Sequence, residues 1–276
     1  MNEAVCGICP HNCRITEGKT GFCGARRNRD GVIIDENYGL VTSLALDPIE
    51  KKPLRRFYPG SMILSVGSYG CNFRCPFCQN YEISMACEKD ANGIFVSPEA
   101  LVQKALELVV RGNIGIAFTY NEPLIGYEYV MDCARLSHKN GLKNVVVTNG
   151  FINEGPLAAL LPYVDAMNID LKSFSEDFYD EIGGKLSDVK KAIAMAARAC
   201  HVEVTTLVIP GKNDSPDEMR MLSAWLASVD PKIPLHISRF FPLYKMTDRD
   251  ATPVSTVCAL AQIARESLSC VYVGNC

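Results

Sequence analysis

The chain has 276 residues, of which 48% are apolar and 21% are charged, and its formal net charge is -3 at pH 7. This composition is typical of a globular protein with a sizeable core, and it gives no support for nucleic-acid binding through a broad basic surface. Because no apolar run approaches the length of a membrane span and residues 1–6 lack a secretory signal, we expect a cytoplasmic protein without membrane attachment.

The sequence pattern changes near residue 60. Residues 1–60 are rich in Cys, Gly, Arg and Asn, so we expect a small, loop-rich N-terminal module that needs a metal in place of a core. In residues 61–276, apolar runs of strand length alternate with helical patterns, which indicates one larger domain. The predicted strands are 62–66, 114–119, 144–148, 166–171, 202–209 and 235–240, and the predicted helices are 99–111, 125–140, 155–161, 186–200, 216–228 and 253–268.

This alternation predicts an α/β fold. Strands that alternate with helices form right-handed βαβ units with a parallel sheet, and the nearly all-apolar strands indicate that helices cover it. Six such units either close partly into a barrel or form an open, doubly wound sheet, and the pattern leaves both open. In both folds the ligand site lies at the carboxyl ends of the strands.

Cysteine is the unusual residue, with 13 in the chain. A cytosolic chain keeps its thiols reduced, so clustered cysteines indicate metal binding rather than disulfides. Four thiolates close together in the N-terminal module suit either tetrahedral zinc or a second 4Fe-4S cluster. The two groups of cysteines are Cys6, Cys9, Cys13 and Cys23 in this module, and Cys71, Cys75 and Cys78 in the larger domain.

The second group directly follows the first predicted strand, at the edge of the sheet where ligands bind. Cys71, Cys75 and Cys78 lie close enough for one loop to wrap a cluster of four irons, which usually has four thiolate ligands. Three thiolates leave one iron open for a substrate-like ligand, as catalytic metal sites do. A zinc loop or three buried thiols is the alternative, although the loop offers no histidine as a fourth zinc ligand.

The loop CNFRCPFC at 71–78 resembles the CxxxCxxC loop of the radical S-adenosylmethionine (SAM) superfamily. The resemblance implies a partial (β/α)6 TIM-like barrel, with a 4Fe-4S cluster whose open iron chelates the amino and carboxylate groups of SAM. It also implies reductive cleavage of SAM to methionine and a 5′-deoxyadenosyl radical, which abstracts hydrogen from a substrate. Phe77 would offer its backbone to the adenine, with simple loop packing as the alternative.

Further segments suggest a narrower family. They are DPIEKKPL at 47–54, FYPG at 57–60, TYNEP at 119–123, VTNGF at 147–151, NIDLK at 168–172, TTLVIPG at 205–211 and HISRFFP at 236–242. Together they resemble the radical SAM enzymes of the AmmeMemoRadiSam system, which are related to pyruvate formate-lyase activating enzymes. This resemblance implies a flavodoxin or ferredoxin-type electron donor, and a protein substrate or system partner proteins.

Polar residues that end the predicted strands are the candidates for SAM binding. By the resemblance, Asn121 and Glu122 stand where the superfamily holds the methionine amino group, although this chain lacks the usual glycines there. A helix cap before Pro123 is the alternative. Thr148 and Asn149 end the next predicted strand, and we expect them at the same site.

The fourth predicted strand carries Asp170 and Lys172 on one face. We expect them to contact the ribose, the methionine carboxylate or a monovalent cation, with an internal pairing of the two as the alternative. The related activating enzymes place an acidic residue where this chain has Val147, which puts the cation in doubt. His201 and His236 follow on the next strands, where a structural role is more common than a catalytic one.

Three hypotheses for the function follow. The first is a radical SAM enzyme acting on an unidentified small molecule or peptide. The second is a glycyl-radical enzyme activase acting on a protein partner. The third, from another class, is a non-catalytic iron–sulfur electron carrier or a zinc scaffold.

Overall fold

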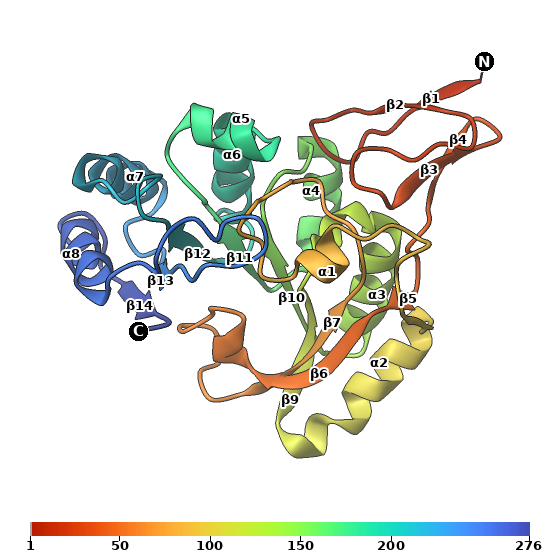
Figure 1. The fold of residues 1–276 in the computed structure, drawn as a ribbon. Helices are drawn as coiled ribbons and strands as arrows, with labels where there is room; N and C mark the ends of the chain where they lie inside the picture. The colour runs from red at the N-terminus through yellow and green to blue at the C-terminus, as the bar shows by residue number, and fades with distance from the viewer. Residues whose placement is uncertain (1) are drawn as a thin grey trace.

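The computed structural model describes residues 2–276 and contains one curved, eight-stranded sheet (Figure 1). Its strands follow one another in space in the order of the chain, whereas a doubly wound sheet reverses its order at a switch point. The fold is therefore the partial barrel. An antiparallel edge strand, β6 (Ser43–Pro48), precedes seven parallel strands: β7 (Met62–Gly67), β9 (Asn113–Phe118), β10 (Lys143–Thr148), β11 (Ala166–Asp170), β12 (His201–Val208), β13 (Leu235–Arg239) and β14 (Val271–Gly274).

Helices cover the outer face of the sheet (Figure 1). Two of them begin at the predicted Ser-Pro caps, where Ser97 Oγ accepts from the N–H of Ala100 and Ser215 Oγ accepts from the N–H of Glu218. These helices are α2 (Pro98–Glu107), α3 (Tyr127–Lys139), α4 (Glu154–Leu160), α5 (Glu176–Ile182), α6 (Leu186–Ala196), α7 (Pro216–Val229) and α8 (Val254–Ala264). The four-residue α1 (Tyr81–Ser84) lies instead at the carboxyl ends of the strands (Figure 1). Within residues 2–276, no helix is long and apolar enough to cross a membrane.

The structure differs from the predicted elements mainly at short segments and helix ends. The predicted helix 99–111 ends at Glu107 and continues as a 3-10 turn, Val109–Arg111, before Gly112 turns the chain with a φ of 84°. The predicted helices 186–200 and 253–268 end four residues earlier, at Ala196 and Ala264. The spacing of apolar residues does not predict the acidic helix α5 or the edge strands β6 and β14, because each element is short and contains only a few apolar residues.

Residues 49–57, which we call the floor segment, pack against the inner face of the sheet. Ile49, Leu54 and Phe57 form a buried cluster with residues of the parallel strands, among them Ile63 and Val145. The floor segment thus closes one end of the barrel interior with apolar side chains. The predicted module boundary at residue 60 stays a prediction, and the sheet takes its strand β6 from inside that module.

The N-terminal part consists of short antiparallel pairs that pack beside the carboxyl ends of the first strands. Buried Arg26 donates to Glu128 on α3, with Nη2 2.7 Å from Oε1, and the side chain of Asn153 donates to the carbonyls of Gly7 and Cys9. The small strands are β1 (Glu3–Val5), β2 (Arg14–Thr16), β3 (Arg26–Arg29), β4 (Val32–Asp35), and β5 (Leu40–Val41) with its partner β8 (Ile94–Phe95).

Candidate active site

A cleft of about 690 Å³ opens where the parallel strands end and extends down to the floor segment. Its lining includes every side chain that the sequence predicted for the cluster and for SAM. The topology explains this convergence, because parallel neighbouring strands deliver their carboxyl ends to one edge. These residues are Cys71, Cys75, Cys78, Phe77, Asn121, Glu122, Thr148, Asn149, Asp170 and Lys172.

The three cysteines of the loop after β7 face this cleft together. Burial raises the pKa of the Cys75 thiol to about 11 and that of Cys71 well above its usual value. Without a metal these groups are therefore neutral thiols, and a bound metal displaces their protons. A donor set of three thiols from one short loop fits a 4Fe-4S cluster with one open iron.

Glu122 is the most heavily bonded carboxylate beside the cysteines. It is 3% exposed, and it accepts hydrogen bonds from Thr148 Oγ1 at 2.7 Å, from the N–H of Asn149 at 2.8 Å and from the N–H of Leu124 at 3.1 Å. Burial raises its pKa to about 7. Glu122 thus caps the short helix at 123–125, as the alternative predicted, and its carboxylate also lines the cleft.

Asp170 and Lys172 form an ion pair, with 2.9 Å between Nζ and Oδ2. Burial opposes the charge of Lys172, but the negative charge of Asp170 and its hydrogen bond to Lys172 raise the pKa of Lys172 above the usual value. The internal pairing that the sequence left as an alternative is therefore present. Because both side chains line the cleft, the pair also presents one positive and one negative group to a ligand.

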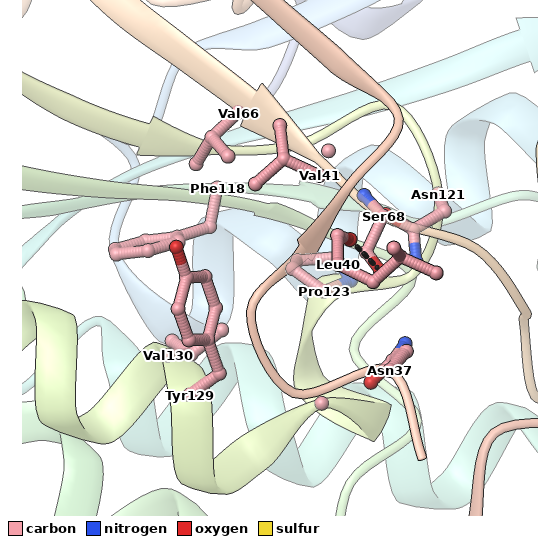
Figure 2. Close-up of a pocket in the computed structure, with 12 residues that line it drawn as sticks. Asn37, Leu40, Val41, Val66, Ser68, Phe118, Asn121, Pro123, Tyr129 and Val130 are labelled. Carbon is pink, nitrogen blue, oxygen red and sulfur yellow. Dashed lines mark hydrogen bonds between the residues drawn. The ribbon is translucent and has the colours of Figure 1, made fainter. Parts of the chain in front are cut away.

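The side chain of Asn121, which the sequence predicted to bind SAM, makes hydrogen bonds to the backbone of residues 68–70. Its Nδ2 donates to the carbonyls of Tyr69 and Gly70, and its Oδ1 accepts from the N–H of Ser68, so it holds the start of the cysteine loop. Figure 2 shows Asn121 beside Ser68 at a second, apolar cavity of about 30 Å³, where Ser68 donates to the carbonyl of Leu40. That cavity has room for about one water molecule, so the larger cleft is the candidate site.

The sequence analysis missed a polar network beneath the site. Glu203 is fully buried and accepts from the N–H groups of Arg55 and Arg56 at 3.0 and 2.7 Å, and from His201 and His236 at 2.9 and 2.5 Å. Burial opposes its charge, but these hydrogen bonds lower its pKa to about 2. The alternation of His201 and Glu203 on one strand was the available signal, but the backbone N–H groups of Arg55 and Arg56 that complete the network lie more than a hundred residues away in the sequence.

Lys52 and Tyr120 are further cleft residues that the sequence analysis did not single out. Lys52 is 3% exposed, and both it and the Tyr120 hydroxyl bond Asp47 Oδ2, at 3.0 and 2.8 Å. Tyr120 has a φ of 75°, which is rare for a residue with a side chain. The bound hydroxyl and this backbone conformation together fix the turn that follows β9.

The Radical SAM superfamily model matches residues 65–222, a span that includes the cysteine loop and extends into α7. The chain belongs to this superfamily. Superfamily membership supports a 4Fe-4S cluster and SAM as cofactors, and reductive SAM cleavage as the general chemistry. The fold predicted for this radical SAM protein is thereby confirmed.

Similar proteins place the chain within the radical SAM superfamily. Uncharacterized protein MJ0808 of Methanocaldococcus jannaschii is 42% identical over 279 residues, covering 99% of this chain and 82% of that protein. Pyruvate formate-lyase-activating enzyme of Clostridium pasteurianum is 26% identical, covering 56% of this chain and 65% of the enzyme. GTP 3′,8-cyclase of Pseudomonas syringae is 28% identical, covering 63% of this chain and 52% of the enzyme. The chain thus spans less than two thirds of either named enzyme.

Solved structures share the fold. A radical SAM methyltransferase from Sphaerobacter thermophilus has a TM-score of 0.60 at 17% identity, covering 79% of this chain and 67% of that one. SuiB of Streptococcus suis bound to S-adenosylmethionine has a TM-score of 0.57 at 12% identity, covering 78% of this chain and 52% of that one. At these identities the likeness concerns the fold alone.

The N-terminal cysteines of this radical SAM protein line one small cavity: Cys6, Cys9, Cys13 and Cys23. Burial raises the pKa of Cys9 to about 12 and also raises that of Cys23. Within residues 2–276, no three His, Cys, Asp or Glu side chains are grouped as ligands of a single metal ion. A cluster or zinc at these cysteines stays a prediction.

Hydrogen bonds connect this cavity to the cysteine loop. The His11 ring lies 2.9 Å from the carbonyl oxygen of Asn72, a residue of that loop. The Asn149 amide donates to Asn72 Oδ1 at 2.8 Å and also contacts the sulfur of Cys71 at 3.8 Å. The two groups of cysteines are therefore joined by a short path of polar contacts.

Proposed function

We propose that this chain holds a 4Fe-4S cluster on Cys71, Cys75 and Cys78 and cleaves SAM reductively to a 5′-deoxyadenosyl radical, which abstracts hydrogen from a substrate. One observation carries the proposal: three thiols of a single loop line the same cleft as the residues predicted for SAM. The cluster supplies the electron and the open iron. The protein would position the SAM and the substrate and exclude part of the water from around them.

The residues around the cleft have distinct roles in this proposal. The carboxylate of Glu122 faces the methionine ammonium, which favours its ionised form despite burial. Phe77 offers its backbone to the adenine and packs its ring against Phe178, with 6.0 Å between ring centroids. Asp170 and Lys172 meet the ribose hydroxyls and the methionine carboxylate, and a monovalent cation is a further proposed ligand of this region.

The proposal extends to family and partners. We assign the chain to the AmmeMemoRadiSam system radical SAM enzymes, with a flavodoxin or ferredoxin as electron donor and a small molecule or peptide as substrate. SuiB, which shares the fold, is known in complex with its precursor peptide SuiA. A glycyl-radical activase role is the second candidate, favoured by the similarity to pyruvate formate-lyase-activating enzyme. A neighbouring glycyl-radical enzyme gene would favour that second candidate.

We also propose that Cys6, Cys9, Cys13 and Cys23 hold a second 4Fe-4S cluster. Support comes from their shared cavity and from the contacts through Asn72 and Asn149 to Cys71. Such a cluster would serve as an electron relay. Zinc is the alternative, and stoichiometric zinc would contradict the relay.

The main proposal has a direct test. Protein reconstituted anaerobically and reduced with dithionite should convert SAM to 5′-deoxyadenosine, measured by liquid chromatography. Cys75→Ala should abolish this activity, because a cluster with two loop thiolates is not held in place. Cys258→Ala, at an exposed position outside both groups, is the matched control and should behave as wild type. Absence of 5′-deoxyadenosine from a fully loaded wild-type protein would overturn the proposal.

A further inference from the structure

Asn149 lines the cleft beside the cysteine loop, but none of the SAM contacts proposed above involves it. It follows strand β10 directly and is 5% exposed. A side-chain amide that is buried to this extent needs partners for its oxygen and its nitrogen, either inside the protein or on a ligand. The partners of the Asn149 amide therefore indicate what it does at this site.

The backbone of Phe151 fixes the orientation of this amide. The N–H of Phe151 donates to Asn149 Oδ1 at 2.9 Å, and the oxygen must face it because an N–H group can only donate. The carbonyl of Phe151 accepts from Asn72 Nδ2 at 2.7 Å, which turns Asn72 Oδ1 toward Asn149. Asn149 Nδ2 donates to that oxygen at 2.8 Å. Flipping either amide would break these bonds, so the nitrogen of Asn149 is identified by its surroundings.

One hydrogen of this nitrogen remains after the bond to Asn72, because a side-chain amide carries two N–H hydrogens. The sulfur of Cys71 lies 3.8 Å from the nitrogen, a hydrogen-bond contact to an acceptor atom larger than oxygen. The backbone N–H of Phe73 donates to the same sulfur at 3.4 Å. Cys71 thus has two N–H donors, whereas within residues 2–276 no side chain donates to the sulfur of the other two cysteines of the loop.

Hydrogen bonds to the sulfurs of an iron–sulfur cluster are among the factors that set its reduction potential. Reduction adds one negative charge to the cluster and its thiolates, and an N–H group that points at a thiolate stabilises that charge. The donor therefore makes the potential less negative. A donor held by other hydrogen bonds is already oriented when the electron arrives, so it stabilises the charge without a reorganisation cost.

We propose that Asn149 is a positioning residue that donates through Nδ2 to the Cys71 thiolate and thereby makes the cluster easier to reduce. The inference rests on the proposed function, because it needs the 4Fe-4S cluster on the cysteine loop. It deepens that function by naming a side chain that sets how readily the cluster takes up the single electron needed for SAM cleavage. In this role Asn149 acts through Cys71 and touches neither SAM nor the substrate.

A redox titration followed by electron paramagnetic resonance tests the proposal without measuring activity. The full chain is reconstituted anaerobically and reduced stepwise with dithionite. The signal of the loop cluster is identified by its change on addition of SAM, since this cluster has the open iron. Asn149→Leu replaces the amide with an apolar group of similar size and should retain its iron. Its reduction should be disfavoured about threefold or more, which is a shift of about 30 mV to more negative potential for one electron.

Asn72→Leu is the matched control, because it breaks the same pair of amides from the other side. The N–H of Phe151 still holds Asn149 Oδ1, so the donor to Cys71 remains in place. The potential of this variant should not be more negative than that of wild type. Asn149→Ala removes the donor without adding an apolar group, should shift the potential in the same direction as Asn149→Leu, and decides the question if Asn149→Leu loses its iron.

Two results would overturn the role of Asn149. One is a wild-type potential in the Asn149 variants, and the other is an equally large negative shift in Asn72→Leu, which would indicate a structural effect of the amide pair.

The outcomes for Asn149 and for the proposed function are separable. A potential that depends on Asn149 in a protein that forms no 5′-deoxyadenosine would remove the proposed reaction and keep the role of Asn149. Formation of 5′-deoxyadenosine with the same potential in wild type and the Asn149 variants would do the reverse. A protein without any SAM-responsive cluster would overturn both.

Discussion

At the scale of single residues, Glu122 shows how one carboxylate joins structure and ligand site. Three donors from two different strand ends hold it, and these bonds oppose the effect of burial on its pKa. The arrangement orients the carboxylate before any ligand arrives, so a positively charged group gains its attraction without a reorganisation cost.

The first prediction concerns this carboxylate. Glu122→Gln should lower the affinity for SAM by about tenfold or more, because it replaces a charge-assisted contact with a neutral one. Equilibrium dialysis with labelled SAM measures the affinity, and iron content should be unchanged. Glu107→Gln, on the exposed face of α2, is the control. Wild-type affinity in Glu122→Gln would contradict the assigned role.

At the scale of elements, the floor segment is the part of the fold that depends most on polar contacts. Glu203 on β12 binds two consecutive backbone N–H groups of this segment, and Asn168 on β11 donates to the carbonyl of Pro53 at 2.9 Å. These contacts fix a largely irregular segment against the sheet, since its only regular element is the 3-10 turn Ile49–Lys51. They also determine where Lys52 and Arg55 enter the cleft.

The pH dependence of stability follows from Glu203. Its folded pKa of about 2 lies below the ordinary value of 4.5, so its ionised form stabilises the folded protein above pH 4.5. This stabilisation, on the order of 3 kcal/mol, should be lost as the pH falls from 4.5 toward 2. Urea unfolding of wild type and Glu203→Gln should therefore differ most near neutral pH and converge in acid.

Glu266→Gln, at an exposed position two residues beyond the end of α8, serves as the charge-matched control for this series. It should follow the wild-type curve throughout. A constant difference between Glu203→Gln and wild type at every pH would show that the bonds of Glu203 do not depend on its charge.

At the scale of the whole molecule, the N-terminal part packs directly on the cysteine loop. A Cβ at Gly70, which has a φ of 85°, would lie 2.7 Å from the carbonyl oxygen of Cys23, so only glycine permits this close approach. Arg74 of the loop donates to the carbonyl of Phe22, and His11 contacts Asn72. The N-terminal part thus contacts the loop at Gly70, Asn72 and Arg74.

We accordingly expect Cys9→Ala to affect both iron content and stability. With two clusters the wild type should bind about eight irons, and Cys9→Ala about four. Without its metal the N-terminal part should become sensitive to limited proteolysis, since it has little core of its own. Cys258→Ala again serves as the control. Unchanged metal content and protease resistance in Cys9→Ala would exclude a metal at these cysteines.

The sequence by itself determined the parallel α/β architecture and the edge of the sheet at which the predicted site residues meet. Apolar strands that alternate with amphipathic helices can bury their apolar side chains in only a few arrangements. Neighbouring parallel strands also necessarily end at the same edge of the sheet. For the same reason, residues as far apart as Cys71, Glu122 and Asp170 could be assigned to one site before the structure was known. The cleft contains each of them.

The periodicity of the sequence left barrel and open sheet undecided, because local periodicity carries no information about strand order. The resemblance of the cysteine loop implied the barrel, and the strand order of the tertiary structure confirmed it. Only the tertiary structure brought Glu203 to the floor segment and, within residues 2–276, left Arg55 without a carboxylate at ion-pair distance. Both facts depend on pairings between residues far apart in the chain, and a local pattern carries no information about such pairings.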